Sequence, residues 1–199
     1  IKDTLIEKIK AVVTQFYGDD VKSSRLYPRI ISDKAFDRLT GYLEGPGEII
    51  YGGRSDKNER YIEPTIIENI PPGSPIMQEE IFGPIIPVMT FRDLDAVADF
   101  INARDKPLAF YYFGKKRDGL RLLSITTSGG ACINDVLMHI ANPRLPFGGV
   151  GMSGMGRYHG RWSFETFSNA RAAVISGNRI DIPLRYPPYK RFKLLKKML

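Results

Sequence analysis

The stretch IIPVMTFRDLDAVADFINARDKPLAFYYFGKKRDGLRLLSITTSGGACIN, residues 85–134, decides the fold of this chain. Three short apolar segments alternate in it with two longer segments whose apolar residues recur at helical spacing. This order predicts a parallel sheet with right-handed crossovers, and nearly all-apolar strands indicate helices on both faces of the sheet. We therefore expect an α/β fold. The expected strands are residues 85–90, 108–113 and 130–134, and the expected helices are residues 93–103 and 118–125.

The flanking segments extend this pattern on both sides. Gly18 occupies the position at which a C-cap glycine would end the first helix. A strand that contains Pro64 is expected to be an edge strand or irregular. Glycines and prolines dominate residues 142–160, which predicts a long irregular loop of the kind that carries function. The further expected elements are helices over residues 2–17 and 33–44, with Ser32 or Asp33 as the N-cap of the second, and strands over residues 48–51, 62–67 and 171–176.

Composition indicates an ordinary globular chain. Its 199 residues are 43% hydrophobic and 26% charged, a composition that requires no disordered or collagen-like class and leaves enough residues for a sizeable core. The single cysteine excludes an internal disulfide framework and fits a reducing compartment. Neither an apolar run of about 18 residues nor a signal-peptide pattern is visible in the sequence, so we expect a cytoplasmic protein.

The net charge of +7 is concentrated at the C-terminus. Residues 1–168 carry 21 basic and 21 acidic side chains, whereas residues 169–199 carry eight basic and one acidic. We interpret this segment as a solvated or subunit-packing tail. Weak contact of residues 190–199 with an anionic membrane surface is left open as an alternative, although ten residues offer little apolar area. No nucleic-acid partner is expected.

A candidate ligand site precedes the first expected strand of the 85–134 stretch. The sequence EEIFGP, residues 79–84, offers a carboxylate acceptor at Glu80 and a flat apolar ring two residues later at Phe82. In an extended segment these two side chains lie on the same side, where they suit a ligand with sugar hydroxyls. The alternative is an ordinary start of a strand, in which a glutamate caps a turn and Phe82 fills the core.

Further blocks downstream extend this observation into a family resemblance. LPFGGVGMSGMG, residues 145–156, is followed by YHG at 158–160 and SFETFS at 163–168. Together with residues 79–84, in this order and at this separation, the blocks resemble the C-terminal half of aldehyde dehydrogenases, in particular the class 3 branch. The resemblance covers essentially the whole chain. Several long blocks in order are far more specific than one short glycine pattern.

The resemblance implies an NAD(P)-dependent enzyme that oxidises medium or long aliphatic, or aromatic, aldehydes to carboxylates. It assigns cofactor binding to Glu80, which would accept hydrogen bonds from the nicotinamide-ribose hydroxyls, and to Phe82, which would pack beside that ribose. The sequence does not distinguish NAD from NADP. For the substrate-binding positions, core packing or structural hydrogen bonding is the alternative role. These positions are Leu137, Ile140, Phe147 and His159.

The same resemblance implies two parts of the chain. Residues 1–168 correspond to the C-terminal part of a catalytic domain with a parallel sheet flanked by helices. Residues 169–199 correspond to an oligomerisation strand and a basic tail. The strand at 171–176 would join a sheet of a neighbouring subunit, giving a homodimer. A strand that closes its own sheet is the alternative.

The catalytic residues of the family lie upstream of Ile1. Its members carry the nucleophilic cysteine, the general-base glutamate, the oxyanion-hole asparagine and the glycine-rich pyrophosphate turn there. We therefore expect no catalytic residue in this chain, a fragment of a longer enzyme, and no aldehyde dehydrogenase activity of the chain by itself. Two other classes remain as alternatives: a non-catalytic oligomerisation or interaction fragment of the same fold, and an adaptor that binds membranes through its basic tail.

Three features that suggest chemistry have structural interpretations. GVGMSG, residues 149–154, fits the G-x-G-x-x-G dinucleotide fingerprint, but Pro143 and Pro146 precede it and YHG, residues 158–160, follows, so its glycines are expected to permit positive φ and close backbone approach. Cys132 lies inside an apolar strand, where burial disfavours a thiolate, and is expected to be structural. His139 is expected to hydrogen-bond in a loop or core. One cysteine and two histidines make no recognisable metal site.

Overall fold

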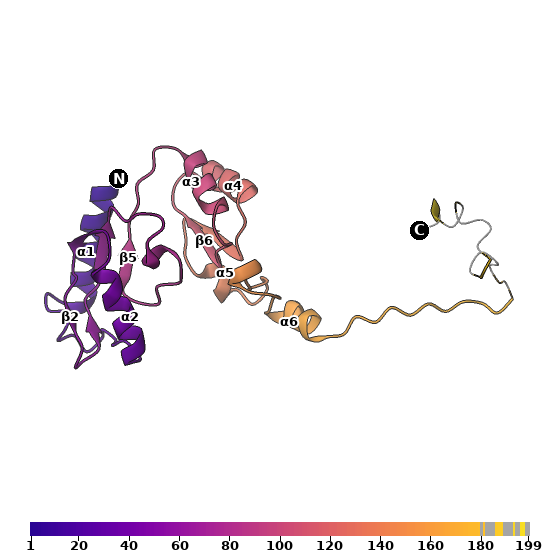
Figure 1. Cartoon of the computed structure of the whole chain (residues 1–199), viewed down its shortest axis with the longest axis horizontal. Helices are drawn as coiled ribbons and strands as arrows, with labels where there is room; N and C mark the ends of the chain where they lie inside the picture. Colours follow the sequence, from indigo (N-terminus) through magenta and orange to yellow (C-terminus); the bar gives the residue numbers. More distant parts are fainter. Residues whose placement is uncertain (180, 182–185, 189–192, 194–195, 198–199) are drawn as a thin grey trace. The chain divides into compact units, whose positions relative to one another are not determined.

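A computed structural model describes residues 1–179, 181, 186–188, 193, 196 and 197 of the chain. These residues fall into two compact units, Ile1–Val97 and Ala98–Leu199. Figure 1 shows the elements of each unit along the chain, and each unit is described by itself. The prediction of an α/β fold is confirmed, since both units combine helices with strands that pair in parallel.

The first unit is built on a three-stranded sheet in the order β1-β4-β5. Strand β4 (Thr65–Glu68) lies in the middle, antiparallel to β1 (Glu48–Tyr51) and parallel to β5 (Ile85–Pro87). Helices α1 (Lys2–Tyr17) and α2 (Asp33–Leu43) belong to the same unit (Figure 1). The sequence predicted α1 and β1 with these bounds. A 3-10 turn, η1 (Pro75–Met77), precedes the segment that leads into β5.

The strand predicted at residues 62–67 was wrong in one respect, because the structure divides it in two. Strand β3 (Tyr61–Ile62) pairs with a short strand that the sequence analysis missed, β2 (Ser55–Asp56), while β4 begins at Thr65. Pro64 lies between β3 and β4 and has no N–H to donate to a ladder. The irregularity expected at Pro64 is therefore confirmed, and it lets the chain change partners from β2 to β1 and β5.

Helix α2 supplies one side of the core of the first unit. The Ser32 side chain accepts a hydrogen bond from the Ala35 N–H at 3.2 Å, which confirms Ser32 as the N-cap. Leu39 has no exposed surface, and Phe36 and Tyr42 are also buried. The core they form with residues of the sheet and its connections further contains Ile62, Ile67, Ile70, Ile76 and Ile85. On α1, by contrast, Ile6 is the buried residue and Phe16 is 58% exposed.

The second unit contains a parallel pair of strands joined by a helix. Strands β6 (Ala109–Tyr112) and β7 (Gly130–Ile133) pair in register, and α4 (Lys116–Ile125) connects them, as the sequence predicted. Helix α3 (Leu94–Asn102) begins in the last residues of the first unit and ends in the second. Its end lies beside α4, where the Asn102 side-chain amide donates to the Ile125 carbonyl at 2.9 Å (Figure 1). The unit continues with α5 (Met138–Ala141), the 3-10 turn η2 (Gly151–Ser153) and α6 (Gly160–Phe167).

The prediction of one sheet through residues 85–134 was wrong. Strand β5 pairs with β4 in the first unit, and β6 pairs with β7 in a separate sheet. The physical reason is that alternating periodicity predicts strands and helices but not hydrogen-bond partners. The apolar edge of β4, which lies outside the 85–134 stretch, takes the pairing of β5.

The segment after α6 forms no strand in the single chain. Residues 169–179 are exposed, including Val174 at 90% and Ile175 at 99%, and among the described residues 171–176 pair with no other strand (Figure 1). Pairing with a second subunit, and the division into residues 1–168 and 169–199, stay predictions. The segment 190–199, with its predicted membrane contact, falls largely outside the described residues. In the part of the chain that is described, no helix is both long and apolar enough to cross a membrane.

Candidate functional site

The segment 79–84 carries the predicted cofactor-binding residues on the surface of the first unit. Glu80 is exposed, and the Phe82 side chain is exposed to 79%, so the interpretation of Phe82 as a core residue was wrong. The backbone of Phe82 has a φ of 49°, a conformation that non-glycine residues with bulky side chains rarely adopt. Two residues later the Pro84 carbonyl accepts from the Thr65 N–H at 2.8 Å, which starts the pairing of β5 with β4.

The two neighbouring carboxylates of this segment differ in their contacts. The Tyr42 hydroxyl donates to Glu79 Oε1, and the Arg38 guanidinium lies 3.5 Å from the same oxygen. The hydrogen bond from Tyr42, together with the positive charge of Arg38, lowers the pKa of Glu79 below its usual value. Within the described part of the chain the Glu80 carboxylate has no such partner. The Glu79 carboxylate is therefore held by contacts with Tyr42 and Arg38, whereas the Glu80 carboxylate can accept hydrogen bonds from a ligand.

Burial also shifts the pKa of Tyr42. Desolvation of the ring raises the pKa of its hydroxyl, and the neighbouring Glu79 carboxylate raises it further. A neutral phenol is the form that can donate to a carboxylate, so the opposite shifts of the two groups stabilise one hydrogen bond. The roles of Tyr42 and Arg38 were not predicted from the sequence, because these residues lie about 40 residues before the segment and a helical pattern does not indicate which loop the helix contacts.

The glycine-rich loop of the second unit is shaped by close backbone contacts. A Cβ on Gly149 would collide with the Ser153 carbonyl oxygen, and Gly154 has a φ of 144°. The three-residue turn η2 stands where a pyrophosphate-binding fingerprint would open a helix. The structural interpretation of residues 149–154 is confirmed, and these glycines make the tight loop possible.

Two of the predicted substrate-binding residues come together in an aromatic cluster around this loop. The rings of Phe147 and His159 stack with centroids 6.1 Å apart, and Tyr158 meets both rings edge-on. The backbones of Phe147 and Tyr158 exchange two hydrogen bonds of 2.9 and 3.1 Å, which fixes the cluster. His159 Nδ1 lies 3.2 Å from the Leu145 carbonyl oxygen.

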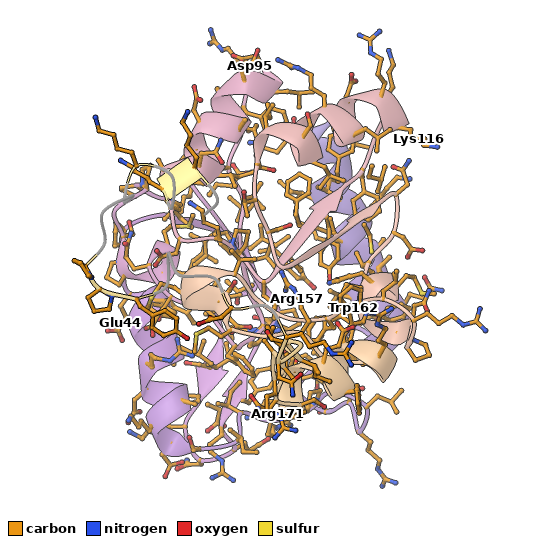
Figure 2. The ribbon with its side chains drawn as sticks, turned by 90° about the vertical axis from the view of Figure 1, so that its right-hand side faces the viewer. Glu44, Asp95, Lys116, Arg157, Trp162 and Arg171 are labelled. Carbon is orange, nitrogen blue, oxygen red and sulfur yellow. The ribbon has the colours of Figure 1, made fainter. Side chains whose placement is uncertain are left out.

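Hydrogen bonds of Arg157 tie the segment that carries Tyr158 and His159 to the glycine-rich loop and to α6. The Arg157 side chain donates to the Gly148 carbonyl, and the Thr166 hydroxyl on α6 donates to the Arg157 carbonyl at 2.6 Å. Figure 2 labels Arg157 on the loop and Trp162 on α6, the two elements that meet here. The ring of His139, on α5, lies 5.9 Å from that of Phe147.

The other predicted substrate-binding residues, Leu137 and Ile140, belong to this short helix α5. Leu137 precedes the helix with a φ of 63° and is 58% exposed, while Ile140 is half-buried. The structure therefore joins Phe147 and His159 directly, and connects the helix of Leu137 and Ile140 to them through His139. Glu80 and Phe82 lie in the first unit and these four residues in the second.

The single cysteine is buried beside a buried histidine. Cys132 on β7 is 8% exposed and His139 is 6% exposed, with Cys132 Sγ 3.4 Å from His139 Nδ1. The ring of Tyr111 packs edge-on against His139. The predictions of a structural Cys132 and a hydrogen-bonding His139 are both confirmed. A thiol enclosed in this way is not accessible to a substrate.

Comparison with known proteins identifies the family. The sequence matches the aldehyde dehydrogenase family over residues 1–173. The chain belongs to this family. It is 45% identical over 199 residues to 4,4'-diaponeurosporen-aldehyde dehydrogenase of Staphylococcus aureus, covering 98% of this chain and 43% of that protein. It is 48% identical to rat aldehyde dehydrogenase family 3 member B1, covering 95% of this chain and 41% of that protein.

Another relative and a solved structure agree with this assignment. The chain is 46% identical to the rat dimeric NADP-preferring aldehyde dehydrogenase, covering 94% of this chain and 42% of that protein. The substrate-bound structure of Staphylococcus aureus AldH superimposes with a TM-score of 0.81 at 45% identity, covering 99% of this chain and 44% of that chain. The resemblance to class 3 aldehyde dehydrogenases is confirmed. This member of the family spans less than half the length of these relatives.

Proposed function

We propose that the protein to which this chain belongs is an NAD(P)-dependent aldehyde dehydrogenase that oxidises aliphatic or aromatic aldehydes to carboxylic acids, and that the chain forms its C-terminal portion. Family membership over residues 1–173 supports the reaction class. The observations that support the role of this chain are the exposed carboxylate of Glu80, which has no partner among the described residues, and the exposed ring of Phe82 two residues later.

The residues of segment 79–84 fit a nicotinamide cofactor. A carboxylate with free lone pairs can accept hydrogen bonds from two adjacent ribose hydroxyls, and an exposed aromatic ring can pack against the sugar. Glu80 and Phe82 would hold the nicotinamide-side ribose of NAD or NADP in this way. When bound, the cofactor supplies the hydride acceptor. The contribution of Glu80 and Phe82 is orientation, which limits the freedom of the reacting groups.

The aromatic cluster of the second unit suits the aldehyde. Phe147 and His159 offer ring faces, and the exposed Leu137 and half-buried Ile140 offer aliphatic surface on the neighbouring helix. A lining of this composition favours aldehydes with an aliphatic chain or an aromatic ring.

The assembly and the activity of the chain itself complete the proposal. The exposed apolar residues Val174 and Ile175 would pair with a second subunit, giving a cytoplasmic homodimer; one relative carries the word dimeric in its name. The chain alone would have no aldehyde dehydrogenase activity, because its one thiol, at Cys132, is buried.

The test is the exchange Glu80→Gln in the natural protein. The glutamine keeps the shape of the side chain but loses the charge that strengthens hydrogen bonds to ribose. Loss of one such bond, worth about 1.5 to 3 kcal/mol, slows NADH formation in a single turnover by about tenfold or more. Glu7→Gln, on the exposed face of α1, is the matched control and keeps the wild-type rate. A wild-type rate of Glu80→Gln would remove Glu80 from the mechanism.

A further inference from the structure

One arginine of the first unit is bonded to three successive residues of segment 79–84. Arg38 Nη2 donates to the Ile81 carbonyl at 2.6 Å, and Arg38 Nη1 lies 3.4 Å from the Glu80 carbonyl and 3.5 Å from the Glu79 carboxylate. The guanidinium group is planar and presents its donors in a fixed fork. It therefore fixes the direction of the backbone on which the Glu80 side chain is mounted.

Helix α2 presents Arg38 to the segment in a set conformation. Arg38 and Tyr42 are four residues apart and share one face of the helix. Arg38 Nη1 donates to the Tyr42 hydroxyl at 2.8 Å, and the guanidinium carbon lies 5.4 Å from the centre of the Tyr42 ring. Because Tyr42 is buried and bonded to Glu79, it holds the arginine in place.

The segment needs such attachment because Phe82 has an unfavourable backbone conformation. Its φ of 49° persists only where the surroundings hold it. On one side of Phe82 the Ile81 carbonyl is bonded to Arg38. On the other side Gly83 packs so closely on α2 that a Cβ there would lie 2.5 Å from Leu39 Cδ2. Phe82 is therefore held between two points of attachment to the same helix.

We propose that Arg38 is a positioning residue for cofactor binding. It ties the backbone of Glu80 and Ile81 to α2, so that the Glu80 carboxylate and the Phe82 ring are presented to the nicotinamide ribose in one conformation. Arg38 does not touch the ribose itself and acts through the segment. This inference rests on the proposed function of Glu80 and Phe82.

The chain contains a matched control for an Arg38→Ala exchange. Arg29 also donates to two backbone carbonyls, those of Lys22 at 2.6 Å and Tyr27 at 3.2 Å, and also lies over a tyrosine ring. The side chains of Arg29 and Arg38 are both 30% exposed. Arg29 holds a different loop, which carries no proposed cofactor contact. Arg29→Ala thus removes the same kinds of bond with no effect expected at segment 79–84.

Two kinds of experiment, enzyme kinetics and hydrogen exchange, separate positioning from a merely structural role. In the natural protein, Arg38→Ala is expected to raise the KM for the cofactor and to slow single-turnover NADH formation by about tenfold, with an unchanged KM for the aldehyde. In the 199-residue chain, hydrogen exchange of the amides of residues 79–84 is expected to become faster in Arg38→Ala. Arg29→Ala should leave all of these at wild-type values. Arg38→Lys, which keeps the charge but lacks the fork, should lie between wild type and alanine.

The outcomes distinguish this inference from the proposed function. If Glu80→Gln slows NADH formation and Arg38→Ala does not, the role of Arg38 is refuted and that of Glu80 stands. If Arg38→Ala lowers stability but leaves the cofactor KM and the 79–84 exchange like those of Arg29→Ala, Arg38 is structural only. If the Arg38→Lys protein folds and has the wild-type cofactor KM, NADH-formation rate and amide exchange, the forked guanidinium is not needed and the proposal is refuted. Wild-type kinetics of Glu80→Gln refute the proposed function itself.

Discussion

The contact between Gly83 and Leu39 predicts a strong dependence of one substitution on another. In Gly83→Ala the new Cβ would lie 2.5 and 2.6 Å from the two terminal methyl carbons of Leu39 and 3.2 Å from its Cγ. Real Cβ contacts are not this short, so the loop or the leucine has to move. Leu39 has no exposed surface and packs in the core of the first unit, so it has no free space to enter. We expect Gly83→Ala to lower the free energy of unfolding by about 1 to 3 kcal/mol, as for overpacking.

The exchange Leu39→Ala provides the second half of the test. By itself it removes a fully buried side chain and is expected to cost about 2 to 5 kcal/mol of stability. In the double variant, however, the atoms that clash with the new Cβ are absent, and the added methyl group fills part of the cavity. The cost of Gly83→Ala should then nearly vanish, which gives a coupling free energy of about 1 kcal/mol or more.

Urea denaturation of the 199-residue chain, followed by circular dichroism, measures all four proteins of this cycle. Gly73→Ala is the control, because a Cβ there meets no atom within 4 Å and the backbone of Gly73 is not in the left-handed region. It should be neutral or slightly stabilising. Additive effects of Gly83→Ala and Leu39→Ala would show that segment 79–84 does not pack on α2 as described, and would weaken the argument for Arg38 as well.

Three further predictions concern pH, assembly and activity. The hydrogen bonds from Arg54 lower the pKa of the buried Glu63. The Glu63 carboxylate therefore stabilises the fold fully above the ordinary glutamate pKa, and this contribution is lost as the pH falls through the lowered pKa. When the free energy of unfolding is measured against pH, Glu63→Gln should lose less stability below about pH 4 than the wild type does. Deletion of residues 170–199 from the natural protein should leave monomer or aggregate in light scattering, and an unchanged oligomer would contradict pairing through 171–176. The purified 199-residue chain should not turn over aliphatic or aromatic aldehydes with NAD or NADP, and turnover that disappears in Cys132→Ser would overturn our interpretation of that thiol.

Local structure was largely determined by the sequence itself. The bounds of α1, β1 and the β6-α4-β7 unit followed from apolar spacing and from the positions of glycines, to within about two residues. These features depend on neighbours within a few residues, which a linear pattern contains. The family resemblance also followed from the sequence, because its blocks are long and ordered, and the match over residues 1–173 confirmed it. Glu80 was likewise selected from its block alone.

Tertiary structure decided what depends on residues far apart in the chain. The pairing of β5 with β4, and the division of residues 62–67 at Pro64, depend on which strand edge lies nearby. The different roles of Glu79 and Glu80 also depend on distant residues. The sequence does not distinguish two adjacent carboxylates, and only the contacts of Tyr42 and Arg38 with Glu79 do so. Periodicity contains no information about a partner about 40 residues away in the chain. Which segment the polar face of α2 contacts is determined only when the helix packs into the core through Leu39.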